Sequence, residues 1–131
     1  MPAKILIDAN FLFLPLEFKI DIFSKLEEAL QKKIEPILPA PVMHEIEKLS
    51  RSKSPKMRKK ASFALELAKK CHVMSVELQK GEKVDDLLIR LAKSLNAIVA
   101  TNDRYLRKKL RTINIPMVHL RQKSRLQAEG V

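Results

Sequence analysis

The sequence predicts an α/β fold, a three-layer sandwich in which helices cover both faces of a central parallel sheet of five strands. Short apolar runs alternate along the chain with longer segments whose apolar residues recur every three or four positions. This alternation is typical of βα units, in which a helix returns the chain to the start of the next parallel strand. The first run, Ile5–Ile7, is apolar on both faces, so we expect it in the middle of the sheet, between strands at Pro36–Leu38 and Ala97–Ala100.

Helix signals follow the first strand. Phe11–Leu14 is apolar and stops at Pro15, which favours a single helical turn. Asp21 is a suitable N-cap for the next helix, and Pro41 suits the first turn of the helix after the second strand. The segments expected in this half are strands at 5–7 and 36–38 and helices at 11–14, 21–33 and 41–50.

In the second half, Ser54 and Pro55 form a natural helix start, and Gly81 marks a turn before another helix. The segments expected here are strands at 73–76, 97–100 and 116–118 and helices at 54–70, 84–95 and 103–111. We find no internal repeat and no linker. The chain therefore divides into one domain, 1–120, and a basic C-terminal tail, 121–131, which we expect to be poorly ordered.

Composition limits the classes of protein to consider. The 131 residues suit one domain, and no apolar run is long enough to cross a bilayer, so we expect a cytoplasmic protein without a membrane partner. The single Cys71 excludes an internal disulfide and a cysteine-based zinc site. The net charge is +11, but residues 1–50 carry 6 basic and 8 acidic side chains while residues 51–131 carry 20 and 7. This basic region favours a polyanionic partner, above all nucleic acid, over a merely solvated charged surface.

Three basic segments are the candidate nucleic-acid contacts: the hydrophilic stretch at the start of the 54–70 helix, the helix after Asp103, and the C-terminal tail. Their side chains would follow the phosphate backbone. Tyr105, the only tyrosine, could stack on a base, although we favour packing within its helix. The candidate nucleic-acid-binding residues are Arg51, Lys53, Lys56, Arg58, Lys59, Lys60, Arg104, Arg107, Lys108, Arg111, Arg121 and Lys123.

Two aspartates follow predicted strands. Asp8 comes directly after the first strand, and Asp103 comes shortly after the fourth. Ligands of open parallel sheets bind beyond the carboxyl ends of the strands. We therefore expect both carboxylates at one end of the sheet, at the ligand site.

Helical phase selects two further acids. At about 100° per residue, Glu45 lies roughly 70° from the centre of the apolar face of its helix and Glu47 roughly 130°. In the 84–95 helix, Asp85 lies roughly 80° from the centre of the apolar face and Asp86 points nearly opposite. We therefore expect Glu45 and Asp85 at the edge of the core and Glu47 and Asp86 in water, with Asp86 favoured by the helix dipole.

Four converging carboxylates would repel each other and take up protons unless a cation neutralised them. Oxygen ligands without sulfur or imidazole suit Mg²⁺ or Mn²⁺. One or two such ions, a pair being about 4 Å apart, would activate a water and stabilise the leaving oxygen of a phosphodiester. The predicted catalytic and metal-binding residues are Asp8, Glu45, Asp85 and Asp103, and the predicted supporting residues are Asn10, Thr101 and Asp86.

Each acid also has a purely structural interpretation. Asp8 and Asp103 could cap helices, Asp85 could be an N-terminal helix charge, and Glu45 could be an ordinary surface acid. The catalytic interpretation is stronger because all four occupy strand ends or core edges on the same side.

The ordered set of motifs resembles the PIN-domain ribonucleases over residues 5–120. Those enzymes carry an apolar strand ending in Asp, a Glu early in a helix, an Asp opening a later helix, and a strand followed by Thr-x-Asp, as at Asp8, Glu45, Asp85 and Asp103. The segments 8–11, 45–49 and 101–107 are also similar to the archaeal relatives of the eukaryotic small-subunit processome nuclease. The extra cysteines and longer ends of the eukaryotic members are missing from this sequence. The family's paired aspartates leave Asp85 and Asp86 as alternative metal ligands, and the helical phase favours Asp85.

The resemblance implies a compact α/β sandwich, Mg²⁺- or Mn²⁺-dependent cleavage of single-stranded RNA, and ribosomal RNA precursor as the substrate. Partners left open are a second copy of the chain and ribosome-assembly proteins. The alternatives are a toxin-type PIN ribonuclease, for which the basic surface is less suitable, and a non-catalytic RNA-binding assembly factor, which would not need four acids. A phosphatase of the Asp-x-Asp type would need an acid at Asn10, and the acidic pair of a phosphorelay receiver is not found.

Overall fold

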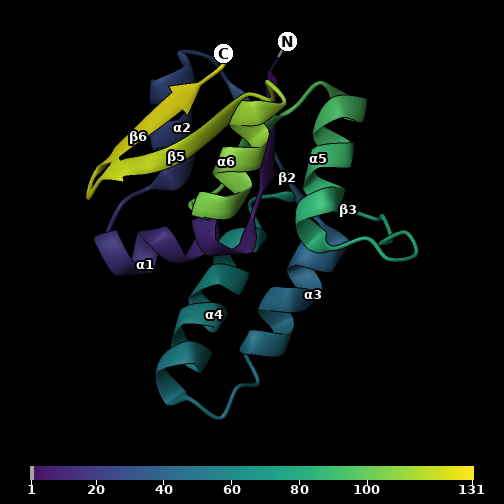
Figure 1. Ribbon diagram of the computed structural model, residues 1–131. Coiled ribbons are helices and arrows are strands. Elements are labelled where there is room, and N and C mark those ends of the chain that lie inside the picture. Colours follow the sequence, from purple (N-terminus) through teal and green to yellow (C-terminus); the bar gives the residue numbers. More distant parts are fainter. Residues whose placement is uncertain (1) are drawn as a thin grey trace.

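The computed structural model describes residues 2–131, and its centre is a six-stranded sheet of order β3-β2-β1-β4-β5-β6 (Figure 1). β1 (Ala3–Ile7) lies between β2 (Ile34–Pro39) and β4 (Ile98–Ala100) and is parallel to both. The predicted central position of the first strand is therefore confirmed. Residues 5–7 are completely buried, because helices cover the sheet on both sides, with α2 behind it and α6 in front of it in Figure 1.

The prediction of five parallel strands is wrong by one strand. β3 (His72–Met74) is the parallel edge strand beside β2, and β5 (Met117–Gln122) is parallel to β4. β6 (Arg125–Glu129) then pairs antiparallel with β5, inside the segment that we expected to be poorly ordered. An edge strand needs only one buried face, and Leu126, which is 8% exposed, supplies it between exposed and half-buried neighbours.

The helices begin where the sequence signals predict, with two corrections at their ends. Helical structure does not end before Pro15 as predicted. Pro15 lies in the first turn of a second helix, where its missing N–H is not needed. The helix capped by Asp21 ends at Leu30 rather than Lys33, because Gln31 adopts a left-handed conformation. The helical elements are η1 (Ala9–Phe13), α1 (Leu14–Phe18), α2 (Ile22–Leu30), α3 (Ala40–Leu49), α4 (Pro55–Ala68), α5 (Val84–Leu95) and α6 (Arg104–Thr112).

Residues 40–68, which we call the arm, project from the body of the domain. α3 and α4 pack against each other, and in Figure 1 their connecting loop is the part of the chain farthest from the sheet. Ser54 caps α4 by accepting a hydrogen bond from the backbone N–H of Met57 (3.3 Å). At the base of the arm, the Lys60 ammonium lies 5.1 Å from the ring centre of Phe13 in η1, a cation–π contact. None of the helices within residues 2–131 is long and apolar enough to span a bilayer.

We expect Leu126→Ala to lower the free energy of unfolding by about 2–3 kcal/mol, because it removes the buried anchor of β6. Leu78→Ala is the matched control, since Leu78 is 42% exposed and its truncation should cost less than about 0.5 kcal/mol. Urea unfolding measures both values. Equal effects would mean that β6 is not packed on the core.

Candidate active site

Asp8 is held rigidly at the carboxyl end of β1. It is 6% exposed, and its backbone N–H donates to the carbonyl of Ala100 at the end of β4 (3.0 Å). One carboxylate oxygen, Oδ1, accepts the backbone N–H of Ala9 (2.9 Å). The other, Oδ2, accepts the hydroxyl of Thr101 (2.7 Å) and the side-chain amide of Asn10 (3.2 Å). Three donors thus fix the carboxylate, and Asn10 and Thr101 occupy the supporting positions predicted for them.

A second group of hydrogen bonds aligns the segment after β4. The buried Thr101 hydroxyl oxygen accepts the backbone N–H of Asp103 (3.1 Å), and the Asn10 side-chain oxygen accepts that of Asn102 (2.9 Å). Asn102 in turn accepts the backbone N–H of Leu120 in β5 (2.8 Å). No role was predicted for Asn102, although it lies inside the Thr-Asn-Asp motif. Its backbone N–H links the segment after β4 to Asn10 after β1, and its side chain links that segment to β5.

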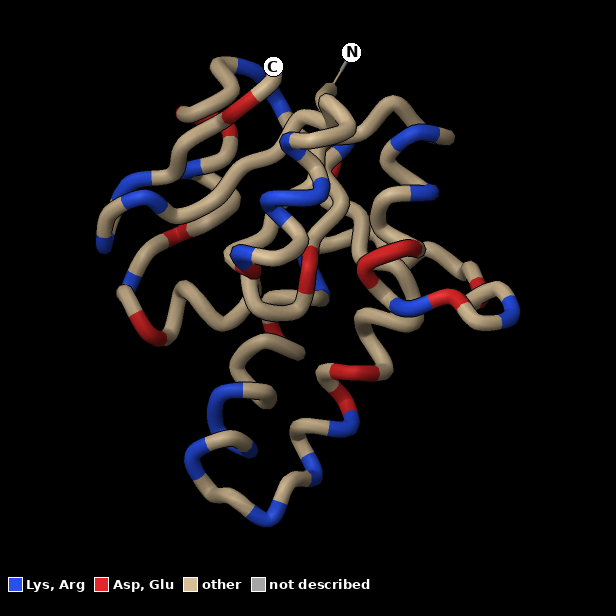
Figure 2. Tube along the Cα trace, viewed as in Figure 1, with Lys and Arg blue, Asp and Glu red and all other residues tan. Residues whose placement is uncertain are grey.

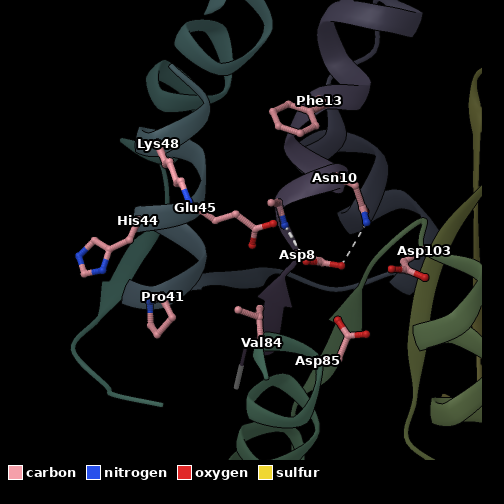
Figure 3. A pocket seen from close by; sticks show the side chains of 11 residues that line it. Asp8, Asn10, Phe13, Pro41, His44, Glu45, Lys48, Val84, Asp85 and Asp103 are labelled. Atoms are coloured by element: carbon pink, nitrogen blue, oxygen red, sulfur yellow. Dashed lines mark hydrogen bonds between the residues drawn. The ribbon is translucent and has the colours of Figure 1, made fainter. Parts of the chain in front are cut away.

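All four predicted acids line one cavity of about 490 Å³ at this end of the sheet. Figure 3 shows Glu45 reaching from α3 towards Asp8, with Asp85 and Asp103 facing it from the starts of α5 and α6. Asp103 also caps α6, since its Oδ1 accepts the backbone N–H groups of Tyr105 (2.8 Å) and Leu106 (3.2 Å). Asp103 therefore caps α6 and lines the cavity at the same time. The other residues lining the cavity are Ala9, Asn10, Phe13, Pro41, His44, Lys48 and Val84.

The helical-phase prediction holds for the aspartate pair and only partly for the glutamates. Asp85 is half-buried in the cavity, whereas Asp86 is exposed, does not line the cavity, and accepts the backbone N–H of Lys83 (3.1 Å). Asp86 therefore supports the start of α5 rather than contacting the other acids. Glu45 lines the cavity but is exposed, and Glu47 is half-buried instead of in water. α3 packs against α4 as well as the sheet, so more than one of its sides is covered.

The electrostatics of the cavity favour neutralisation of its acids. Burial raises the pKa of Asp8 to about 6, and repulsion by Asp85 and Glu45 adds to the increase, while the hydrogen bonds from Thr101 and Ala9 oppose it. Burial and the charge of Asp85 raise the pKa of Glu45. Burial and the charge of Asp103 raise the pKa of Asp85, and Lys109 partly opposes them. The negative charges of the neighbouring acids, which contribute to these increases, also attract a cation.

The donor set fits a hard divalent cation. All four acids offer carboxylate oxygens, which suit Mg²⁺ or Mn²⁺. Across residues 2–131, no three His, Cys, Asp or Glu side chains are close enough together to hold one ion by themselves. Mg²⁺ commonly binds one or two carboxylates and keeps several waters, so the spacing suits an ion whose remaining ligands are water.

Two residues of the cavity were missed or undervalued from the sequence. No role was predicted for His44 or Lys48. Both side chains are exposed, and both line the cavity. The signal was available, because Pro41, His44, Glu45 and Lys48 recur every three or four positions and so share one side of α3.

The predicted RNA-binding residues of α6 divide into two groups. Arg107 donates to His119 Nδ1 (2.9 Å), which leaves His119 Nε2 to donate to Glu129 (2.9 Å). The buried Nε of Arg107 has no hydrogen-bond partner within residues 2–131. Arg111 forms an ion pair with Glu129 (3.0 Å). These two arginines therefore join α6 to β5 and β6, whereas Arg104 and Lys108 are exposed.

The remaining basic candidates are mostly exposed. Figure 2 shows basic residues gathered on the far part of the arm and along α6, with acidic residues between them. Arg121 is exposed and donates to the Gln127 side chain in β6. Tyr105 is 81% exposed, so the interpretation that we favoured, packing within its helix, is wrong. Along the arm and in the last segment, the exposed candidates are Arg51, Lys53, Lys56, Arg58, Lys59 and Lys123, while Lys60 is half-buried against Phe13.

Comparison with known proteins gives a consistent set of relatives. The family model described as "PIN like domain" matches residues 5–123. Ribonuclease VapC4 of Methanocaldococcus jannaschii is 35% identical over 129 residues, which cover 98% of each chain. The rRNA-processing protein FCF1 of Saccharomyces cerevisiae is 35% identical over 120 residues, which cover 89% of this chain but only 59% of FCF1. The solved structure of the PIN domain endonuclease Utp24 superposes with a TM-score of 0.80 at 29% identity, covering 99% of this chain and 93% of that one.

We expect Asp8 to lower the stability of the metal-free protein as the pH rises from about 4 to 7. Asp8 has a pKa of about 6 when folded against 3.8 for an ordinary aspartate, so the folded state binds more protons in this range and loses stability as they leave. The contribution of Asp8 is about 1–3 kcal/mol, at 1.36 kcal/mol per pKa unit. Asp8→Asn should remove this part of the pH dependence in urea unfolding with a chelator present. The pH slope is the quantity to compare, because the amide alters the hydrogen bond with Asn10 at every pH. An unchanged slope in the variant would contradict the assignment.

Proposed function

The chain belongs to the PIN-like domain family, and from this premise we propose that it is a metal-dependent endoribonuclease that cuts single-stranded RNA. The observation that carries the proposal is the cavity itself, which is lined by four carboxylates from four separate segments of the chain. A purely structural role for these acids does not explain why mutual repulsion and burial are tolerated at one place. PIN nucleases generally use divalent metal ions, which agrees with the donor set.

The chain's own residues have distinct tasks in this proposal. Asp8, fixed by Thr101 and Asn10, supplies a carboxylate that cannot rotate away from the cavity. Asp85 and Asp103 lie at helix starts, and Glu45 approaches from the opposite side, so the scissile phosphate would lie between the two groups (Figure 3). A divalent cation bound to one or two of these carboxylates supplies positive charge for the phosphate and leaving oxygen and lowers the pKa of the attacking water.

Basic residues on both sides of the cavity would hold the RNA backbone. Lys48 lines the cavity, and the exposed lysines of the arm continue from it along α4 (Figure 2). On the other side, Arg104 follows Asp103 directly and Lys108 lies about one helical turn further along α6. Attraction to phosphates from both sides offsets the repulsion between RNA and the acids of the cavity.

We propose ribosomal RNA precursor as the substrate, supported by the likeness to FCF1, named as an rRNA-processing protein, and to the endonuclease Utp24. A second candidate is a toxin-type ribonuclease that cuts another RNA. The observation that favours a different substrate is that Ribonuclease VapC4 matches over 98% of both chains, whereas FCF1 extends well beyond the matched segment. A non-catalytic assembly factor is the third candidate, and it predicts RNA binding without cleavage.

Single-turnover cleavage with titrated Mn²⁺ tests the chemistry. We expect Asp8→Asn and Asp85→Asn to lower the cleavage rate by at least about a hundredfold, because each removes a carboxylate from the cavity, and we expect chelator to abolish cleavage. Asp86→Asn is the matched control next in sequence, exposed and outside the cavity, and its rate should stay within about threefold of the wild type. An active Asp85→Asn beside an inactive Asp86→Asn would show that we chose the wrong aspartate.

The substrate is tested by offering the same enzyme a ribosomal RNA precursor fragment, an unrelated single-stranded RNA of equal length, and transfer RNA. Selective cutting of the precursor at one position supports rRNA processing. Selective cutting of another RNA supports the second candidate, and metal-independent binding without any cutting supports the third.

The arm is tested by the salt dependence of RNA binding in metal-free buffer. Replacing Lys53, Lys56 and Lys59 together by Gln should flatten the plot of log K against log salt by about 2 units, if each contacts one phosphate of a single strand. The control replaces Lys32, Lys33 and Lys93, exposed lysines that precede β2 and β4 and so lie at the opposite end of the sheet. Equal slopes for both triple variants would remove the arm from the RNA contact surface.

A further inference from the structure

A groove between α5 and α6 is not used by the cavity chemistry. It has a volume of about 410 Å³, within the range typical of small-ligand sites. α5 contributes Asp86 and Ile89, and α6 and its end contribute Tyr105, two lysines, Thr112 and Ile113. The lysines are Lys108 and Lys109, both exposed. The groove therefore combines an aromatic ring, apolar side chains and two cations.

Tyr105 is the unusual residue of this groove. Its side chain is 81% exposed, more than any other large apolar or aromatic side chain described as exposed. The spacing of Tyr105, Lys108, Lys109 and Thr112 along α6 places the ring and the ammonium groups on one side of the helix, away from the buried Leu106 and Leu110. An aromatic ring beside lysines is the arrangement that binds a stacked base with its phosphates.

Residues of the groove are direct neighbours of residues of the acid cavity. Tyr105 donates its backbone N–H to Asp103 (2.8 Å), which lines the cavity, and Asp86 of the groove is next in sequence to Asp85 of the cavity. Both helices start at the cavity, and the groove runs between them. An RNA strand that has one phosphate among the acids can therefore place the neighbouring nucleotide on Tyr105.

We propose that this groove is a nucleotide subsite, in which an unpaired RNA base stacks on Tyr105 and the adjoining phosphates lie against Lys108 and Lys109. The inference rests on the proposed ribonuclease function and adds a positioning residue to it. It also gives a physical reason for a single-stranded substrate, because a base inside a duplex is stacked between its neighbours and has no free face for the ring. The two lysines favour a nucleic acid over a protein as the occupant of the groove.

The composition of the chain provides a direct probe. Tyr105 is the only tyrosine and there is no tryptophan, so tyrosine fluorescence reports this one ring. The ligand is a single-stranded oligouridine of about twelve nucleotides, within the usual footprint of single-strand binding proteins, added to wild-type protein in chelator so that it is not cut. We expect its binding, followed separately by polarisation of a labelled oligonucleotide, to quench the fluorescence. The same oligonucleotide paired with oligoadenine should quench much less.

Four substitutions complete the test. Tyr105→Leu should weaken binding by about fivefold to a hundredfold, the usual loss for one stacked base, whereas Tyr105→Phe keeps the ring and should stay within about twofold of wild type. Lys109→Gln should weaken binding more than Lys93→Gln, its counterpart outside the groove. In single-turnover cleavage, Tyr105→Leu should raise the half-saturating protein concentration and leave the rate at saturation within about threefold.

The outcomes separate this inference from the function it rests on. RNA binding without quenching, together with wild-type affinity of Tyr105→Leu, would overturn the subsite and leave the ribonuclease intact, with the groove then a surface for a protein partner. Failure of every single-stranded RNA to bind would contradict the ribonuclease and the subsite together.

Discussion

The hydrogen bond from Thr101 to Asp8 spans 93 residues of sequence, and the geometry of the cavity depends on it. β1 and β4 are neighbouring parallel strands, so both end at the same edge of the sheet, and the side chains that follow them meet there. At 2.7 Å the bond joins a buried hydroxyl to a carboxylate, a class of hydrogen bond worth about 1.5–3 kcal/mol. Because the same hydroxyl oxygen accepts the backbone N–H of Asp103, one side chain sets the positions of two acids.

The cavity places function and stability in opposition. Burial and repulsion raise the pKa values of Asp8, Glu45 and Asp85. At neutral pH, ionisation of these acids therefore lowers the stability of the folded state relative to the unfolded chain. A continuous apolar core, which includes the fully buried residues 5–7, offsets this cost. Acids maintained at such a cost are typical of sites that bind a cation or move a proton.

Local signals in the sequence predicted the elements that pack on the core, and tertiary contacts determined the rest. The period of the apolar residues in α5 gave its bounds, 84–95, and separated Asp85 from Asp86, because the core covers that helix on a single side. Glu47 did not follow the same logic, since α4 covers another side of α3. β6 was missed because Leu126 is an isolated apolar residue in a basic segment, and only its pairing with β5 makes it a strand. Arg107 and Arg111 have the composition of RNA contacts, but their partners, His119 and Glu129, come from distant strands that no local pattern reveals.

We propose that the cavity lined by the four acids binds a divalent cation through one or two of their carboxylates, and metal-linked stability tests this most directly. If Mn²⁺ binds the folded protein and not the unfolded chain, the free energy of unfolding at pH 7.5 should rise with Mn²⁺ concentration, by about 2.7 kcal/mol at a hundred times the dissociation constant. The rise should be lost in the protein with both Asp8→Asn and Asp85→Asn and retained in Asp86→Asn. The account would be contradicted if the free energy of unfolding of the wild type did not change with Mn²⁺, or if that of the double variant rose with Mn²⁺ as much as that of the wild type.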